Sequence, residues 1–525
     1  MPIPLLQLVQ VAIVTGISSH LIFKRAEPRV LPALGMVCAL QTVAFGYIYN
    51  DTHEFLHASI ASFAVISALL FGLFTSIAIY RLSPWHPLAR YRGPTLAKLS
   101  KWYMGYWIAK GNRHLKLQEL HRTYGRWIRI GPNELSVDDP AAIRPIYSQM
   151  FRSLSYQGAP QAADALITTV NKDEHALRLV AWTKAFSIER LKHYRTSAQA
   201  RTAQLLELLA KKKETVSLSH WISLWAIDVM GDMSFSGGFE TLAAGKDAEG
   251  WMEVLHMGVL FVGVLGQVPW MRDLIALAPS PGPILTFQQF AGKKVEETSR
   301  KTGGNRNDIL SIIQNDTEGK VELTRLQAHA DASFIVLAGS DTVSEAMTAL
   351  MRYIIDDAKV QQRLRSELNS AFDGPLEDMD ASTLLKLPYL DACVQEALRL
   401  VPPVAAGPPR WNKDIPTQVL DHVIPASTTI APPNYAIFRD PRNFFDPEKF
   451  LPERWLGGIT PHNVDAFVPF CFGPGLFCAR LLTANLIRAF SVSFPNDFNV
   501  KIFDESYKEH NLWVHDELLV NLEAL

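Results

Sequence analysis

The C-terminal region of the chain contains a glycine-rich stretch, FCFGPGLFCAR at residues 470–480, followed directly by an apolar segment with a helical pattern. Gly473 and Gly475 lack a Cβ atom, so the backbone can turn tightly there and approach a flat ligand closely. The helix predicted over residues 479–490 would place the positive end of its dipole beside Cys478, which favours a thiolate. A single thiolate without a second ligand at zinc-like spacing suits haem iron better than zinc. The alternative is a buried structural cysteine in a tight loop.

The composition of the whole chain is that of a large globular protein. Its 525 residues are enough for a large core. The 51 basic and 52 acidic residues nearly cancel, which gives no indication of nucleic-acid binding. The four cysteines lie at positions 38, 393, 471 and 478 without a framework spacing, so we do not expect a disulfide-stapled secreted protein.

Three apolar stretches occupy the N-terminal region, at about residues 4–23, 30–49 and 58–80. Each is about 20 residues long and contains no Asp, Glu, Lys or Arg, as a helix that crosses a bilayer requires. The sequence therefore predicts up to three transmembrane helices. The alternative is a single span accompanied by two helices that lie in the membrane interface.

The charges that flank these stretches indicate one orientation. The second loop is acidic, with Asp51 and Glu54. Basic residues instead follow the first and third stretches: Lys24, Arg25 and Arg29, then Arg81, Arg90, Arg92, Lys98 and Lys101. By the positive-inside rule we expect a luminal N-terminus and a cytosolic chain after residue 80.

The segment after the third stretch is rich in proline, which fixes φ and removes hydrogen-bond donors. We therefore expect a membrane anchor over residues 1–80, a stiff connector over residues 81–94 and one domain over residues 95–525. That domain reads as long helices with a few short strands.

A long helical pattern over residues 328–355 contains an unusual group of small and polar residues, Ala338, Gly339, Asp341 and Thr342. The small residues would let a planar group lie against the helix, and Thr342 can donate a hydrogen bond back to a carbonyl, so that a local kink is expected. Spacings of four and three residues place four side chains on one face of this helix: Phe334, Ala338, Thr342 and Glu345. The alternative is a notch for helix–helix packing.

A second helical pattern contains Glu396 and Arg399 at i and i+3, where the two side chains can pair. Apolar neighbours indicate that the pair is buried, and Arg454 from a Pro-Glu-Arg-Trp segment can complete the network. Such a network points to architecture more than to stability.

These four segments occur in the order found in cytochrome P-450 monooxygenases, and the chain resembles that family from about Pro84 to its C-terminus. Weaker matches are found at His175, Arg178, Phe186-Ser187 and Arg439-Asp440-Pro441. The anchor and connector resemble those of the microsomal class, in a fungal-like form with several N-terminal membrane helices. The resemblance implies a mainly α fold with small β sheets, the cytochrome P-450 fold, preceded by transmembrane helices. It also implies an endoplasmic reticulum membrane protein whose catalytic domain is cytosolic.

The resemblance assigns roles to individual residues. Cys478 would be the axial thiolate of haem b and thus the metal ligand. Thr342 and Asp341 would be catalytic, because they organise the protons needed for oxygen activation, while Ala338 and Gly339 make room for oxygen beside the haem.

Further residues are implied at the haem propionates, which are carboxylates that need charged donors. The candidates are Arg410, His175 and Arg178. The cysteine loop departs from the family by an apparent one-residue insertion, with Phe470 and Gly473 lying one position too early. Leu476 replaces the usual basic residue, so we expect Arg410 or Arg480 to compensate.

The function that the resemblance implies is oxygen insertion into a lipophilic small molecule, such as a terpenoid or another secondary metabolite. Electrons would come from an NADPH-cytochrome P-450 reductase on the same membrane, which would dock on a basic patch that contains Arg480 and Arg488. The substrate pocket would be lined by residues 154–170, by Phe334 and Leu337, and by residues 404–407. Two alternatives remain: a haem enzyme that isomerises or dehydrates, and a haem-free membrane protein that binds ligands on the same fold.

Overall fold

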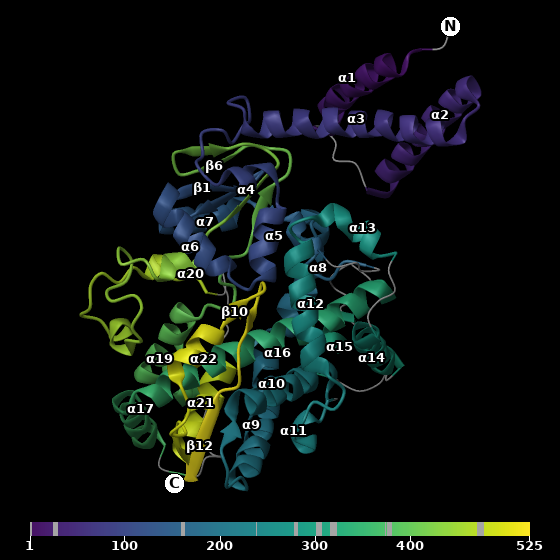
Figure 1. Ribbon diagram of the computed structural model, residues 1–525. Coiled ribbons are helices and arrows are strands. Elements are labelled where there is room, and N and C mark those ends of the chain that lie inside the picture. The colour runs from purple at the N-terminus through teal and green to yellow at the C-terminus, as the bar shows by residue number, and fades with distance from the viewer. Residues whose placement is uncertain are drawn as a thin grey trace.

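The computed structural model describes residues 3–24, 30–158, 163–237, 239–277, 282–300, 307–314, 323–372, 374, 381–469 and 477–525. Over these residues the protein is mainly helical and contains four small sheets. Three N-terminal helices form an arm that projects from one end of the molecule, and the C-terminus lies at the opposite end (Figure 1).

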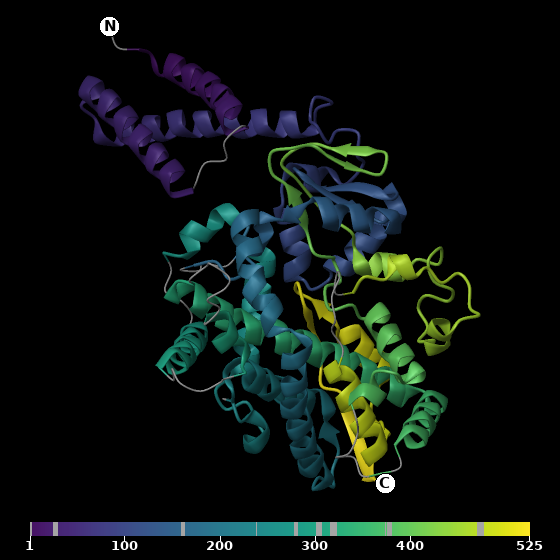
Figure 2. The ribbon, with the colours of Figure 1, turned by 180° about the vertical axis from the view of Figure 1, so that it is seen from behind.

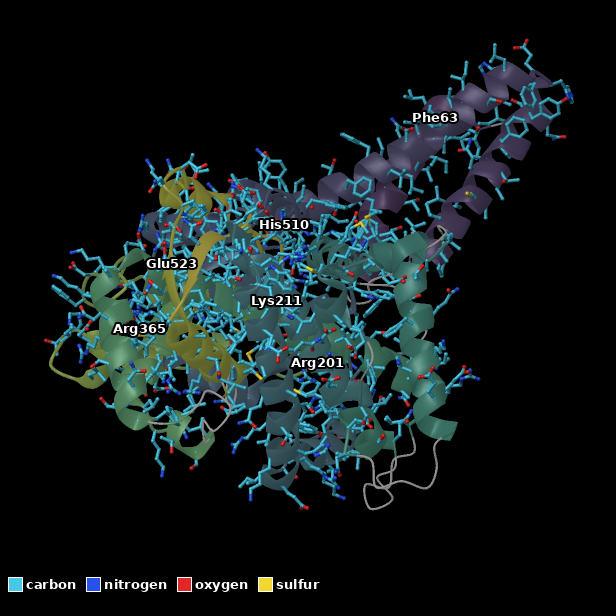
Figure 3. The ribbon with its side chains drawn as sticks, turned by 90° about the horizontal axis from the view of Figure 1, so that it is seen from below. Phe63, Arg201, Lys211, Arg365, His510 and Glu523 are labelled. Atoms are coloured by element: carbon cyan, nitrogen blue, oxygen red, sulfur yellow. The ribbon has the colours of Figure 1, made fainter. Side chains whose placement is uncertain are left out.

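The arm consists of α1 (Leu5–Phe23), α2 (Val30–Thr52) and α3 (Phe55–Leu82), which confirms the helices predicted from the three apolar stretches. All three are long and apolar enough to cross a membrane. Large apolar side chains such as Phe63 are exposed along the arm (Figure 3). Apolar surface of this extent indicates contact with lipid or with another protein.

Two glycines set the close packing of α1 against α3. A Cβ atom on Gly16 would lie 2.0 Å from the carbonyl oxygen of Leu69, and one on Gly72 would lie 2.4 Å from that of Ile13. Only glycine allows the two backbones to approach this closely, as in packed transmembrane helices.

The body of the protein contains the remaining helices and all of the described strands (Figure 2). Its first half contains the α-helices α4 (Thr95–Leu99), α5 (Trp102–Ala109), α6 (Arg113–Tyr124), α7 (Pro140–Gln149), α8 (Lys172–Ala185), α9 (Ile188–Ala210), α10 (Leu218–Phe235), α11 (Thr241–Ala244), α12 (Trp251–Leu265), α13 (Arg272–Ile275), α14 (Gly282–Arg300) and α15 (Ile309–Gln314). Its second half contains the α-helices α16 (Arg325–Asp356), α17 (Ala358–Ala371), α18 (Ala381–Leu384), α19 (Pro388–Leu400), α20 (Asn434–Phe438), α21 (Phe477–Ala489) and α22 (Val500–Ser506). The described 3₁₀ turns are η1 (Leu154–Gln157), η2 (Pro269–Met271), η4 (Pro452–Leu456) and η5 (Val464–Ala466).

The strands form a five-stranded sheet and three smaller sheets in the described chain. The larger sheet has the order β1-β2-β8-β5-β3, with β2 and β8 parallel and the other pairs antiparallel. Its strands are β1 (Trp127–Gly131), β2 (Glu134–Val137), β3 (Phe151–Arg152), β5 (Arg410–Asn412) and β8 (Thr428–Ala431). The smaller sheets pair β6 (Thr417–Val419) with β7 (His422–Ile424), β10 (Lys508–Glu509) with β11 (Trp513–Val514), and β12 (Leu519–Ala524) with β4 (Val216–Ser217) and β9 (Phe490–Ser493).

A buried histidine ties α6 to the larger sheet. The Nδ1 atom of His121 lies 3.0 Å from the carbonyl oxygen of Gly125, and its Nε2 atom lies 2.8 Å from the hydroxyl of Ser136 in β2. Since a carbonyl only accepts, Nδ1 carries the proton and Nε2 accepts from the serine. Burial lowers the pKa of His121 to about 4, so the ring is neutral in the folded protein at neutral pH.

The helix predicted over residues 328–355 is α16, which runs unbroken for 32 residues through the middle of the domain. It is apolar enough to cross a membrane, but two thirds of its apolar window is buried by protein. Its C-terminal half packs into the largest apolar core together with α10, α19 and α21. This central position lets α16 present polar side chains to the interior of the domain.

Candidate active site

The small and polar residues of α16 make two kinds of contact. Thr342 donates its hydroxyl to the carbonyl oxygen of Ala338 at 2.7 Å, which confirms the predicted bond back to the helix. A Cβ atom on Gly339 would lie 2.4 Å from Cε of Met230 in α10. Gly339 thus packs closely against Met230, and half-buried Ala338 and Thr342 lie near it along the helix, so that the role of Ala338 and Gly339 beside a haem stays a prediction.

Asp341 is a buried carboxylate beside Thr342, with only 5 % of its surface exposed. Its Oδ1 atom lies 3.3 Å from Nε2 of His256, which comes from α12. The hydrogen bond with Asp341, together with its charge, raises the pKa of His256 above its ordinary value in spite of burial. The partner of the predicted catalytic acid is thus a histidine 85 positions earlier in the chain, which sequence reasoning did not connect to it.

A second acid–histidine pair lies one helical turn further along α16. Glu345 places Oε2 at 3.2 Å from Nε2 of His515, which directly follows β11. Burial raises the pKa of Glu345 above its ordinary value. Burial also opposes the charge on His515, but the neighbouring carboxylate raises the pKa of this histidine above its ordinary value. The spacing of Asp341 and Glu345 at i and i+4 was the sequence signal that these two carboxylates share a face.

Cys478 lies in the first turn of α21, as the predicted helix after the cysteine loop requires. The loop residues Phe470, Cys471, Gly473, Gly475 and Leu476 lie outside the described residues, so the expected insertion there stays a prediction. Burial raises the pKa of the Cys478 thiol to about 11, because no described cationic side chain offsets the loss of solvent. The thiolate expected at this helix start stays a prediction, and a bound cation such as haem iron would supply charge that favours it.

The donor set around Cys478 fits a haem iron rather than a metal held by the protein alone. Among the described residues, the one group of three or more potential metal-ligating side chains is elsewhere, at His256, Asp341 and Glu345. Cys478 thus offers a single sulfur ligand, as haem iron in a porphyrin requires.

The predicted propionate partners come together at one place. His175 in α8 feels the charges of Arg178, Arg410 and Arg152, and burial together with these three cations lowers its pKa to about 4. Arg152 in β3 lies opposite Arg410 in the register of β3 with β5. Sequence reasoning did not identify Arg152 as a member of this group. Nε2 of His175 is buried without a hydrogen-bond partner. A concentration of positive charge with an unsatisfied polar atom is the environment that an anionic group such as a propionate requires.

Arg178 differs from the other members of this group, because it already has a carboxylate partner. It donates to Oδ2 of Asp331 in α16 at 2.8 Å, and both side chains are almost fully buried. Its Nε atom is buried without a partner. The Nε–H of Arg178 therefore stays available for a further anion.

The two arginines of α21 bind acceptors within the domain. Arg480 forms an ion pair with Asp391 of α19, and its side chain is 12 % exposed. Arg488 donates to the carbonyl oxygens of Phe372 and Gly374 at 3.0 Å each. These contacts favour Arg410 over Arg480 as the compensating cation and do not favour Arg480 and Arg488 as a basic docking patch.

The predicted Glu396 network is confirmed, and all of its charged groups are fully buried. Arg399 donates from Nε and Nη2 to the two oxygens of Glu396 at 3.0 and 2.9 Å, and Arg454 donates from Nε at 3.0 Å. Trp455 donates its indole N–H to the same carboxylate at 2.9 Å, which the sequence did not indicate. Burial alone would raise the pKa of Glu396, but the two arginines hold it below its ordinary value.

A buried acid–alcohol pair on a central helix and a cysteine at the start of another helix agree with the predicted class, a haem-thiolate oxidoreductase. Comparison with known proteins agrees: the family model "Cytochrome P450" matches residues 94–506, and the chain belongs to the cytochrome P450 monooxygenases, which bind haem iron through a thiolate. A cytochrome P450 monooxygenase, FCK2, from Fusarium pseudograminearum is 32% identical over 84% of this chain and 82% of its own length. Cytochrome P450 67 from Uromyces fabae is 29% identical over 95% of this chain and 96% of its own length. Tryprostatin B 6-hydroxylase from Aspergillus fumigatus is 29% identical over 86% and 83% of the two chains.

Proposed function

We propose that this protein is a membrane-anchored monooxygenase that inserts one oxygen atom from O2 into a lipophilic small molecule, a terpenoid or another secondary metabolite. The observation that carries the proposal is the position of Asp341 beside Thr342 on α16, where a buried carboxylate adjoins a hydroxyl in the middle of the domain. Oxygen insertion consumes protons as well as electrons, so it needs such a pair close to the reacting centre. Isomerisation or dehydration does not need a proton supply for oxygen, so the intact pair disfavours that alternative.

The residues described above would hold haem b at this centre. Cys478 would ligate its iron, Arg410 and Arg152 would neutralise its propionates, and His175 would offer them its unpartnered Nε2 atom, with Arg178 contributing through its Nε–H. Bound haem iron supplies the activation of dioxygen. Thr342 would hold a proton at its hydroxyl, positioned by the bond to the Ala338 carbonyl, and Asp341 would return the next proton from its buried carboxylate.

The proposed substrate class rests on apolar and small residues and on the relatives. Phe334 lies on α16 with its ring centroid 6.5 Å from that of Trp182, and Leu337 packs at the edge of an apolar cluster. With the described parts of residues 154–170 and with residues 404–407, they would line an apolar pocket. The Aspergillus fumigatus relative is named as a hydroxylase of tryprostatin B, which supports a secondary metabolite as substrate.

The proposed location follows from the arm and its flanking charges. Residues 1–80 would anchor the protein in the endoplasmic reticulum membrane, residues 81–94 would connect, and residues 95–525 would form the cytosolic catalytic domain. In this orientation the domain faces an NADPH-cytochrome P-450 reductase on the same membrane, which would supply the electrons.

The absorption spectrum of the reduced protein under carbon monoxide tests the proposal. We expect a red-shifted Soret band of the thiolate type in the wild type and in Cys38→Ser, which changes an exposed cysteine of the arm. The band should be lost in Cys478→Ser, because serine does not supply the sulfur ligand. NADPH oxidation with purified reductase, coupled to oxygenated product from a terpenoid library, then identifies the monooxygenase. An unchanged spectrum in Cys478→Ser, or no haem absorbance in the wild type, would overturn the assignment.

A further inference from the structure

The two acid–histidine pairs of α16 form one cluster of four side chains, here called the His–acid cluster: His256, Asp341, Glu345 and His515. They come from α12, from two successive turns of α16 and from the segment after β11. The ligand atoms of His256, Asp341 and Glu345 all lie within 4.8 Å of one another. Ligand atoms from α12 and α16 thus lie close together, and His515 is connected to them through its contact with Glu345.

The cluster is buried and incompletely satisfied. Asp341 and Glu345 expose 5 % and 6 % of their surfaces, and the His515 side chain exposes 7 %. Oδ2 of Asp341, Oε2 of Glu345 and Nε2 of His515 have no hydrogen-bond partner of normal geometry. Because a buried polar atom without a partner costs about 1–3 kcal/mol, three of them in one cluster indicate a missing component.

The hydrogen bonding of His515 shows that its Nε2 atom faces Glu345 with either a proton or a metal ion between them. Its Nδ1 atom lies 2.6 Å from the carbonyl oxygen of Asp516, and a carbonyl only accepts, so Nδ1 carries a proton. In the neutral ring, Nε2 then directs a lone pair toward Oε2 of Glu345 at 3.2 Å. Two lone pairs facing each other repel unless a positive charge lies between them. Metal-bound histidines usually have this arrangement, in which one ring nitrogen donates to a carbonyl and the second ring nitrogen faces the metal.

The charge and the distances fit a divalent cation. When both carboxylates are ionised and both histidines are neutral, the cluster carries two negative charges, which one divalent ion neutralises. In a tetrahedral zinc site with bonds of about 2.0–2.1 Å, neighbouring ligand atoms lie about 3.3 Å apart. The two acid–histidine contacts measure 3.3 and 3.2 Å. Imidazole nitrogens favour zinc over magnesium or calcium, which prefer oxygen ligands.

We propose that the His–acid cluster is a binding site for a divalent metal ion of the zinc type, separate from the haem iron. His256, whose side chain is 35 % exposed, provides the entry from solvent. If the proposed function is correct, a bound ion holds Asp341 by its carboxylate and prevents it from passing protons to Thr342. Zinc would then inhibit oxygenation without removing the haem.

The first test measures zinc binding to the full-length, haem-loaded protein in lipid nanodiscs after treatment with a chelator. We expect one zinc ion per chain in addition to iron, by elemental analysis and by calorimetric titration with zinc chloride. Glu345→Gln and His515→Gln should weaken zinc binding at least about 100-fold, since each removes a direct ligand. Matched controls are His329→Gln on α16 and Glu253→Gln on α12, which lie outside the cluster and should bind zinc as the wild type does.

X-ray absorption at the zinc edge of the wild type gives a second test that needs no variant. We expect only nitrogen and oxygen ligands at about 2.0–2.1 Å. Sulfur in the zinc shell, the absence of stoichiometric zinc, or unchanged affinity in Glu345→Gln and His515→Gln would overturn the proposal. Failure of the proposed function is separate, because it would appear in the carbon monoxide spectrum and in product formation without any added zinc.

Discussion

Replacing Glu396 by glutamine tests whether the buried ionic network holds the domain together. The substitution keeps the shape of the side chain but removes its negative charge, which leaves Arg399 and Arg454 fully buried without an anion. Removal of one partner from a buried ion pair typically costs about 3–5 kcal/mol, because the remaining charge stays desolvated. The hydrogen bonds from Trp455 and from the backbone N–H of Leu451 would find a weaker acceptor as well.

The expected shift in melting temperature follows from the size of the domain. An unfolding entropy of about 2.1 cal/mol/K per residue over roughly 430 residues gives about 0.9 kcal/mol/K. A loss of 3–5 kcal/mol therefore lowers the melting temperature by about 3–6 °C. The measurement is thermal unfolding of the haem-loaded protein in nanodiscs, followed by tryptophan fluorescence at one fixed scan rate.

Glu453→Gln is the matched control, because it lies in η4, the 3₁₀ turn that also contains Arg454. Glu453 pairs with Arg363 at 2.8 Å, but both side chains are about half exposed. An exposed ion pair contributes about 0–1 kcal/mol, so this variant should shift the melting temperature by about 1 °C or less. Equal shifts in the two variants would refute the reasoning that burial, rather than pairing as such, sets the cost.

Three further predictions follow from other parts of the structure. The pKa of His121 is about 4 in the folded protein, against an ordinary value of 6.5, so protons bind the unfolded chain preferentially and the stabilising contribution of His121 is lost as pH falls below 6.5. Between pH 7 and pH 5 the free energy of unfolding should therefore drop by about 2 kcal/mol more in the wild type than in His121→Gln. Equal drops in the two proteins would contradict this. Gly16→Val should separate α1 from α3, and proteolysis of the arm in nanodiscs should then be faster. Gly46→Val is the control and should have no such effect, since a Cβ atom on Gly46 would meet no atom within 4 Å. Equal proteolysis of the two variants would contradict the packing. Thr342→Ala should keep the carbon monoxide spectrum but lower oxygenated product per NADPH consumed at least about tenfold, since a positioned proton donor contributes about 10²–10⁴ in rate; unchanged coupling would exclude its role.

The sequence predicted the elements whose physics is local. The three stretches of the arm became helices because length and apolar composition suffice to specify a spanning segment. The long helix through residues 328–355 and the bond from Thr342 to Ala338 followed from helical periodicity and from a side chain too short to reach anything but its own helix. The ionic pair of Glu396 and Arg399 was predictable for the same reason, since three residues in a helix bring two side chains to one face.

The tertiary structure alone decided which distant groups meet. No spacing in the chain relates His256 to Asp341, or His515 to Glu345, because these contacts depend on how α12 and the C-terminal segment pack against α16. No spacing in the chain relates Arg152 to Arg410 either, or Arg178 to Asp331, with which it forms a buried ion pair.

Protonation also depended on the fold. The sequence placed Cys478 at a helix start, where the dipole favours a thiolate, whereas burial raises its pKa to about 11. Contacts within a helix depend on residues that are a few positions apart, so the sequence determined them. Desolvation and the pairing of distant charges arise only when the folded chain excludes water from a particular place, so the folded structure decided them.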